Sequence, residues 1–270
     1  PIIRRMAGLG KADLTADFHH AYYDKQYLFA DVAVIGGGPA GMVAALSAAE
    51  SGAEVILVDE GAELGGSLWY ARFNADGTHG SLTRAELENA VAARRNIRVL
   101  SEAVCTGLFA DNWLPVIKDN RLYKLRARAT VVATGSIEQP SVFRNNDLPG
   151  VMFASAAQRL VRLYAVKPGS RAVVLAANDD GYGAALEMLD AGIAIAAMAD
   201  LRAEVPATEL VQAVRRAGVE VLAGHAIKEA IAGPGKTRIT GAIAAPVVGE
   251  GKLGEGDRTF DCDLILMAVG

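Results

Sequence analysis

This sequence of 270 residues has few cysteines, a small net charge and no long apolar run. The two cysteines, Cys105 and Cys262, lie far apart and in no CxxC spacing, so the sequence supports neither a dithiol redox centre nor a zinc site. A net charge of −4 argues against nucleic acid or an acidic membrane as a partner. No apolar run approaches the roughly 18 residues of a membrane span, and the amino terminus has no signal-peptide pattern. We therefore expect a soluble, cytoplasmic chain with reduced thiols.

Small and aliphatic residues make up much of the sequence. Apolar residues account for 51% of it, and there are 29 glycines. This composition is typical of an α/β protein with many tight turns. A chain of this length can bury the core of one large domain or of two modest ones.

The most informative segment spans residues 31–60. An apolar strand leads into the loop GGGPAG, a helix of small residues follows, and a second strand ends on Asp59. In this pattern Gly36 allows a tight turn, Gly38 lets the backbone approach a pyrophosphate, and Gly41 lets helix and strand pack closely. An acid about 20 residues beyond the glycines accepts hydrogen bonds from ribose hydroxyls. The segment therefore predicts a site for an adenine dinucleotide.

Neighbouring residues sharpen this prediction. Pro39 and Ala40 open the helix, and Ala40 offers its backbone to the dinucleotide. Glu60 and Gly61 follow the ribose-binding acid with no arginine in the next few positions, which disfavours a 2′-phosphate and hence NADP. NAD and FAD both carry ADP, so the loop alone does not separate them.

Three further segments supply candidate cofactor contacts. Ser67, after Gly66, is placed either to hydrogen-bond phosphate or ribose or to cap its own loop. Val104 ends a strand that offers backbone groups to adenine or else packs in the core. Thr134 and Gly135 end an expected buried strand at 130–135, at the sheet edge where open α/β folds bind ligands.

A second strand–helix–strand pattern covers residues 171–200, but its loop is altered. At its three glycine positions stand Ala176, Asn178 and Gly181. Asp179 and Asp180 add like charge where a pyrophosphate would approach. Asp200 keeps the acid position at the end of the second strand. We interpret this unit as degenerate and structural, and the alternative is a site for a different, cationic ligand.

The two patterns predict an α/β fold of two Rossmann-like dinucleotide-binding domains, the second inserted in the first, as in pyridine nucleotide-disulfide reductases. The last strand repeats the apolar-small-glycine pattern of residues 130–135, so we expect it to return to the first domain. The expected parts are a lead-in at 1–30, a split first domain at 31–149 plus 241–270, and the inserted domain at 150–240. Because a central strand rarely forms a terminus, we expect a truncated part of a longer polypeptide.

No catalytic or metal-binding arrangement stands out. His79 and His225 have no sequence-level partner for acid–base work, and His19-His20 has none at metal-ligand spacing. We therefore predict no catalytic residue and no metal ligand. In enzymes of this kind the cofactor performs the chemistry.

Several strings resemble the α subunit of heterotetrameric sarcosine oxidase. They are PIIRRMAGLGKA at 1–12, YLFADVAVIGGGPAGMVAALSAAESGAEVILVDE at 27–60, FRNNDLPGVMFASAAQRL at 143–160 and NDDGYGAALEMLDAGI at 178–193. The NDD loop makes this resemblance more specific than the glycine pattern, which many flavoproteins share.

The resemblance implies a role in a larger complex. In that family the α subunit is longer than this chain and holds NAD that takes no part in turnover. The β subunit carries FAD and a covalently attached FMN, γ and δ subunits complete the heterotetramer, and tetrahydrofolate binds at the carboxyl-terminal domain of the α subunit. The complex converts sarcosine, water and oxygen to glycine, peroxide and a one-carbon unit. Carried over by position, the NAD contacts fall on the loop 36–41 with Ala40, and on Asp59, Glu60, Gly61, Ser67 and Val104.

Other functions stay open. An FAD-dependent pyridine-nucleotide oxidoreductase would hold FAD in the split domain and NAD(P)H in the insert, but the altered second loop argues against it. A nucleotide-free scaffold that docks partner subunits is disfavoured by the intact first loop. Related α-type subunits serve other amine or imino-acid dehydrogenases and hydrogen cyanide synthase, which leaves the amine substrate open.

Overall fold

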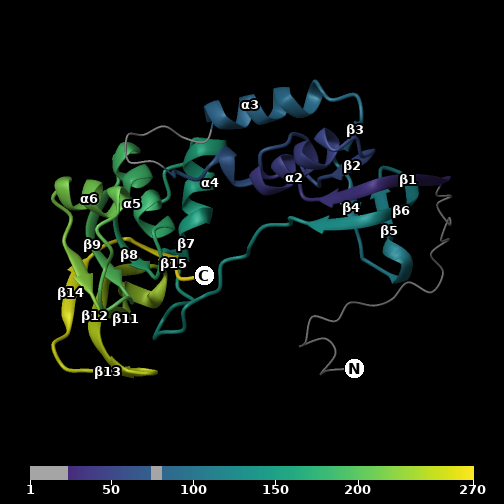
Figure 1. Ribbon diagram of the computed structural model, residues 1–270. Coiled ribbons are helices and arrows are strands. Elements are labelled where there is room, and N and C mark those ends of the chain that lie inside the picture. The colour runs from purple at the N-terminus through teal and green to yellow at the C-terminus, as the bar shows by residue number, and fades with distance from the viewer. Residues whose placement is uncertain (1–23, 74–80) are drawn as a thin grey trace, which may run out of the picture.

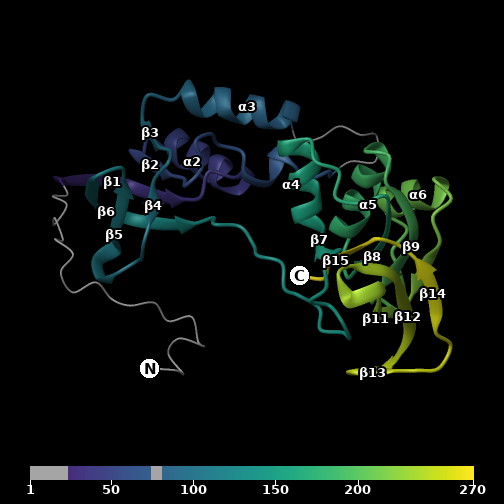
Figure 2. The same cartoon turned by 180° about the vertical axis from the view of Figure 1, so that it is seen from behind.

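The computed structural model describes residues 24–73 and 81–270. These residues form two α/β units that lie side by side (Figure 1). The first unit comprises residues 24–132 and the second unit residues 151–268. The segment 133–150 runs from one unit to the other, as both views show (Figures 1 and 2).

The first unit is built on a six-stranded sheet in the order β3-β2-β1-β6-β5-β4. Its strands are β1 (Asp24–Ile35), β2 (Val55–Val58), β3 (Ile97–Leu100), β4 (Val104–Cys105), β5 (Trp113–Lys118) and β6 (Arg121–Val132). Strands β3, β2, β1 and β6 run parallel, and β5 and β4 continue the sheet antiparallel. Helices α2 (Pro39–Glu50) and α3 (Ser81–Ala92) lie on the same side of the sheet in both views (Figures 1 and 2).

Local sequence explains the elements that position the site. Strand β2, with the sequence VILV, is buried along its whole length, as expected of an inner parallel strand. Helix α2 begins with proline, which is favoured at the first helical position because its missing N–H has no intrahelical partner there. Its residues Met42, Ala45 and Ala49 are buried, and the small side chains let the helix lie close to the sheet.

The second unit contains a five-stranded parallel sheet in the order β10-β9-β8-β15-β7. Its strands are β7 (Val151–Phe153), β8 (Arg171–Ala176), β9 (Ala194–Asp200), β10 (Val221–Ala223) and β15 (Leu264–Ala268). Its helices are α4 (Ala154–Tyr164), α5 (Asp180–Asp190) and α6 (Glu209–Arg216). A separate antiparallel sheet consists of β11 (His225–Ala232), β12 (Ile239–Gly249), β13 (Lys252–Leu253) and β14 (Arg258–Asp261). The short 3-10 helices of the chain are η1 (Gly66–Trp69), η2 (Ala110–Asn112) and η3 (Pro234–Lys236).

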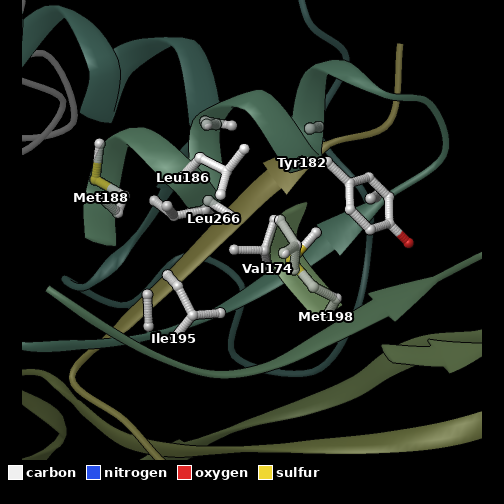
Figure 3. Close-up of a cluster of buried hydrophobic side chains, with 14 of the residues drawn as sticks. Val174, Tyr182, Leu186, Met188, Ile195, Met198 and Leu266 are labelled. Carbon is white, nitrogen blue, oxygen red and sulfur yellow. The ribbon is translucent and has the colours of Figure 1, made fainter. Parts of the chain in front are cut away.

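The second unit has a core of its own between the parallel sheet and its helices (Figure 3). Val174 from β8, Leu186 from α5 and Leu266 from β15 pack together there. Burying a side chain of this size contributes about 1.5–3 kcal/mol relative to leaving it exposed. The ring of Tyr182 belongs to the same cluster, while its hydroxyl points away from it (Figure 3).

The strand pairing contradicts the predicted return of residues 241–270 to the first domain. Strand β15 lies between β8 and β7, with Ile265 opposite Val173 on one side and Val151 on the other. Strand β12 pairs with β11 and β14. The apolar-small-glycine pattern indicates a buried parallel strand, but it does not say which sheet the strand joins, because the ladder is made by backbone groups that every residue carries.

The predicted lead-in at residues 1–30 is also wrong in part. Strand β1 begins at Asp24 and pairs with β6 along its length, so residues 24–30 belong to the sheet. Residues 1–23, with His19-His20 and the first resembling string, lie outside the described residues.

Of the buried strand expected at residues 130–135, only residues 130–132 form a strand, and they are the end of β6, where the chain becomes exposed. Val132 is 63% exposed there. Strand β5 pairs with β6 only as far as Arg126, and beyond that point β1 is its partner within the described part of the chain. One edge of the strand therefore faces outward.

Candidate functional site

The loop between β1 and α2 requires glycine at two positions. Gly36 has φ +104°, and a Cβ atom there would lie 2.2 Å from the carbonyl oxygen of Ala133. A Cβ atom on Gly41 would lie 1.8 Å from the carbonyl oxygen of Gly36. A Cβ atom on Gly38 would instead approach only the Cα of Gly66, at 3.9 Å. The loop is therefore closely packed on one side and has room for a ligand at Gly38.

The amino terminus of α2 lies at the same place. Gly38 is the N-cap, and no side chain caps the first turn. The first N–H groups of a helix have no partner within it, and the helix dipole favours negative charge there. A pyrophosphate suits this position.

Asp59 connects the end of β2 to the glycine loop. Its Oδ2 accepts a hydrogen bond from the backbone N–H of Gly37 at 2.5 Å, and its Oδ1 accepts one from that of Gly61 at 2.8 Å. The residue is partly exposed. Because a carboxylate has about four acceptor positions, two remain for the hydroxyls of a ribose.

These elements border a cleft of about 900 Å³, which is the size of a cofactor site. The residues predicted from the sequence that line it are Gly36, Gly38, Pro39, Ala40, Asp59, Glu60, Gly61, Gly66, Ser67, Thr134 and Gly135. They converge because β1, β2 and β6 are parallel neighbours, so their carboxyl ends meet at one edge of the sheet.

Two predicted residues lie outside the cleft lining. Gly41 is a buried residue of α2 that lies directly against the backbone of Gly36, so its part is to permit close packing. Val104 is 48% exposed on β4. The neighbouring Ala103 donates its backbone N–H to the carbonyl oxygen of Asp59.

Sequence reasoning missed one wall of the cleft. Trp69 and Tyr70 line it from the first unit, and Arg159, Leu163 and Tyr164 line it from α4 of the second unit. Arg159 donates from Nη2 to the Tyr70 hydroxyl at 3.0 Å, and its guanidinium carbon lies 4.5 Å from the centre of that ring. The aromatic pair directly follows Gly66-Ser67-Leu68 and could have been noted. The residues of α4 had no local signal, because only the docking of the two units brings them here.

The corresponding acid of the second unit is enclosed in an internal network. Asp200 is fully buried and accepts hydrogen bonds from the Tyr182 hydroxyl at 2.7 Å and from Arg202 Nη2 at 2.8 Å. Arg202 also binds Asp179 Oδ1 through Nη1 at 3.0 Å. Burial by itself would raise the pKa of the Asp200 carboxyl, but the bonds from Arg202 and Tyr182 outweigh it and hold that pKa below its usual value. Burial and the bond to Asp200 raise the pKa of Tyr182.

The altered loop of the second unit is likewise bonded to itself. Asn178 Oδ1 accepts the backbone N–H of Asp180 at 3.1 Å. A Cβ atom on Gly181 would lie 2.8 Å from the Cβ of Ala176, so this glycine keeps only its packing role. The groups that would meet a ribose and a pyrophosphate are thus engaged within the protein, which supports the interpretation of a structural unit.

The two thiols lie in different units. Cys105 is half-buried on β4, whereas Cys262 is buried beside the core of the second unit. Burial raises the pKa of the Cys262 thiol to about 11, so it stays protonated near neutral pH. The described residues contain no cluster of side chains suited to a metal ion, and none of their helices is long and apolar enough to cross a membrane. His79 lies outside the described residues.

Comparison with known proteins agrees with this geometry. The chain is 36% identical over 216 residues to the sarcosine oxidase subunit alpha of Rhizobium meliloti (strain 1021), which is 75% of this chain and 22% of that protein. It is 33% identical over 281 residues to the sarcosine oxidase subunit alpha of Corynebacterium sp. (strain P-1), which is 98% of this chain and 28% of that protein. The resemblance noted in the sequence is confirmed, and the chain spans between 22% and 28% of the length of these relatives.

The fold has close counterparts among solved structures. The thioredoxin reductase of T. acidophilum superposes with a TM-score of 0.68 at 17% identity, over 90% of this chain and 77% of that chain. At this identity the likeness shows the fold alone, and it confirms the predicted Rossmann-like α/β class. Residues 30–270 match the family described as "Pyridine nucleotide-disulphide oxidoreductase". The glycine loop, the acid at the end of β2, the cleft and the family match agree, and the chain belongs to this family of dinucleotide-binding oxidoreductases.

Proposed function

We propose that the first unit binds NAD in its cleft, and that the chain is the NAD-binding, non-catalytic part of the α subunit of a sarcosine-oxidase-type complex. β, γ and δ subunits would complete this cytoplasmic complex, with flavins on the β subunit and tetrahydrofolate bound elsewhere. One observation carries the proposal. Asp59 stands partly exposed beside an accessible glycine loop, whereas Asp200 is buried against Arg202.

The cleft residues fit the parts of NAD. The space at Gly38, which a Cβ atom would fill, and the start of α2 receive the pyrophosphate. Asp59 receives the ribose of the adenosine half. Glu60 and Glu63 line the cleft as well, and their carboxylates disfavour a 2′-phosphate by charge repulsion. This repulsion favours NAD over NADP.

The remaining predicted contacts serve the other half of the dinucleotide. Ser67 and Thr134 line the cleft with hydroxyl groups, and Gly135 adds backbone groups without bulk. Bound NAD would supply a hydride acceptor. A hydride relay between NAD(P)H and a flavin needs two dinucleotide sites, and the ion pair of Arg202 with Asp179 in the loop of the second unit argues against the second one. We therefore assign NAD a role other than turnover in this chain.

The second candidate is an FAD-dependent pyridine-nucleotide oxidoreductase. Two observations favour it, namely the family match and the aromatic residues Trp69, Tyr70 and Tyr164 along the cleft, against which a large ring system can stack. In that case FAD occupies the cleft of the first unit. The closed loop of the second unit argues against a nicotinamide site there.

An absorption spectrum of the purified chain, with mass spectrometry of whatever heat releases, separates the two functions. A colourless protein that releases NAD, or that binds NAD when it is added, supports the proposal. Flavin bands in the visible spectrum together with released FAD contradict it and favour the reductase.

A further inference from the structure

We propose that Arg159 of the second unit binds the phosphates of the dinucleotide held in the first unit. The second unit would thereby complete a site that it does not itself contain. This inference rests on the proposed NAD site and adds a binding residue to it from a helix outside the nucleotide-binding motif.

The charge of the cleft calls for such a residue. Three carboxylates line it, those of Asp59, Glu60 and Glu63, and a bound pyrophosphate adds two more negative charges. Arg159 is the one cation among the described residues that line the cleft. Backbone N–H groups at the start of α2 contribute partial charges only, so a full positive charge nearby adds substantially to phosphate binding.

The contacts place Arg159 across from the glycine loop. A Cβ atom on Gly66 would lie 2.9 Å from the Cα of Gly38, so η1 begins directly against this loop. Tyr70 follows η1 immediately, and the guanidinium of Arg159 lies over its ring. One of the five N–H groups of that guanidinium binds the Tyr70 hydroxyl, and an edge of its planar fork can still engage two phosphate oxygens.

The two units are held together close to this point. A Cβ atom on Gly183 in α5 would lie 2.2 Å from the carbonyl oxygen of Arg72, so α5 packs directly on the backbone of the first unit. The Arg72 side chain is buried and pairs with Asp190 at the end of α5. Helix α4 packs beside α5 and is fixed with it. Arg159 therefore reaches the cleft from a helix that packs beside the contact between the two units.

The test compares the chain with its Arg159→Met variant by titration calorimetry. The probes are NAD, ADP and adenosine, of which only the first two carry phosphate. We expect the Kd of NAD and of ADP to rise about tenfold. A tenfold change in Kd corresponds to about 1.4 kcal/mol, and a hydrogen bond to a charged group contributes a free energy of this order. The Kd of adenosine stays unchanged. Tyr70→Phe is the matched control, because it removes one hydroxyl contact and keeps the cation.

Two results would overturn the inference: an unchanged affinity of Arg159→Met for NAD, or an equal loss for adenosine, which would reveal a structural effect. Arg159→Lys is the control for misfolding, because it keeps the charge and most of the packing. Its Kd for NAD should lie between those of the wild type and Arg159→Met. If the wild type itself binds neither NAD nor ADP, the proposed function fails before Arg159 is tested, so the two failures are distinguishable.

Discussion

The two units share one strand–helix–strand plan and use its terminal acid in opposite ways. Asp59 of the first unit is partly exposed and accepts hydrogen bonds from two backbone N–H groups of neighbouring loops. Asp200 of the second unit is fully buried and is bonded to Tyr182 and Arg202. The comparison teaches that side chains of the protein can engage the terminal acid of one unit, while the same position in the other unit stays accessible.

The largest expected effect on NAD binding is at Gly41, the last glycine of the first pattern, and its counterpart in the second unit is Gly181. Gly41→Ala should abolish NAD binding, because the new Cβ atom would lie 1.8 Å from the carbonyl oxygen of Gly36 and the loop must move. Gly181→Ala meets a side-chain carbon at 2.8 Å and should lower the melting temperature while leaving NAD affinity unchanged. Calorimetry and thermal unfolding of both variants measure this contrast. Loss of NAD binding in both would remove the functional difference between the units.

The acids themselves give the next largest effect on binding. Asp59→Ala should raise the Kd of NAD about 100-fold, since it removes the charged acceptor of two hydrogen bonds donated by the ribose hydroxyls, each worth about 1.5 kcal/mol. Asp200→Ala, in the second unit, should leave the Kd unchanged. Equal losses in the two variants would contradict the assignment of the NAD site to the first unit.

For the free energy of unfolding we expect the opposite order, with the larger effect at Asp200 and the smaller one at Asp59. Asp200→Ala leaves Arg202 without its buried partner and should lower the free energy of unfolding by about 2 kcal/mol; this figure sits below the usual 3–5 kcal/mol because the Arg202 side chain is 24% exposed. Urea denaturation measures it, with Asp59→Ala as the control that changes stability less.

The stability difference should depend on pH. The folded-state pKa of Asp200 lies below the unfolded value of 3.8, so its contribution is fully present above that value and is lost as the pH falls through the folded pKa. The gap between the wild type and Asp200→Ala should therefore be constant from pH 7 to pH 5 and should shrink near pH 3. A gap that is as large at pH 3 as at pH 7 would show that Asp200 acts through packing alone.

The smallest effect is expected at Asp180. Asp180→Ala removes an acid from the first turn of α5 and should cost only about 0.5 kcal/mol of stability. NAD affinity should not change, because the loop of the second unit does not line the cleft. A change of more than about twofold in the Kd of NAD would mean that the two units do share a ligand.

The sequence was most informative where a few adjacent residues decide the geometry. Gly36 and Gly41 were predicted as the tight turn and the close contact, and the backbone at both positions excludes any side chain. The altered second loop was visible in the same way, since Asn178, Asp179 and Asp180 alone predict a poor phosphate site. Arg202, which pairs with Asp179 of that loop and with Asp200, was not anticipated, because these contacts depend on how the end of β9 lies against the loop.

Sequence reasoning failed where the answer depended on which segments lie side by side. The pattern of residues 264–270 identified a buried strand and assigned it to the wrong sheet, because backbone ladders do not depend on residue type. Val104 was expected beside the cofactor; it does not line the cleft, while its neighbour Ala103 is bonded to Asp59, and its contact with a cofactor stays a prediction.

The sequence by itself determined the Rossmann-like α/β class of the chain, the loop that can approach a phosphate and the acid that can bind a ribose, because these follow from short-range sterics and spacing along one βαβ unit. Only the tertiary structure decided the wall of the cleft that α4 provides, the position of Arg159 on Tyr70 and the burial of Asp200. These features depend on the docking of helices and sheets far apart in the sequence. That docking depends on the packing of many residues together, so it cannot be predicted from any one short segment.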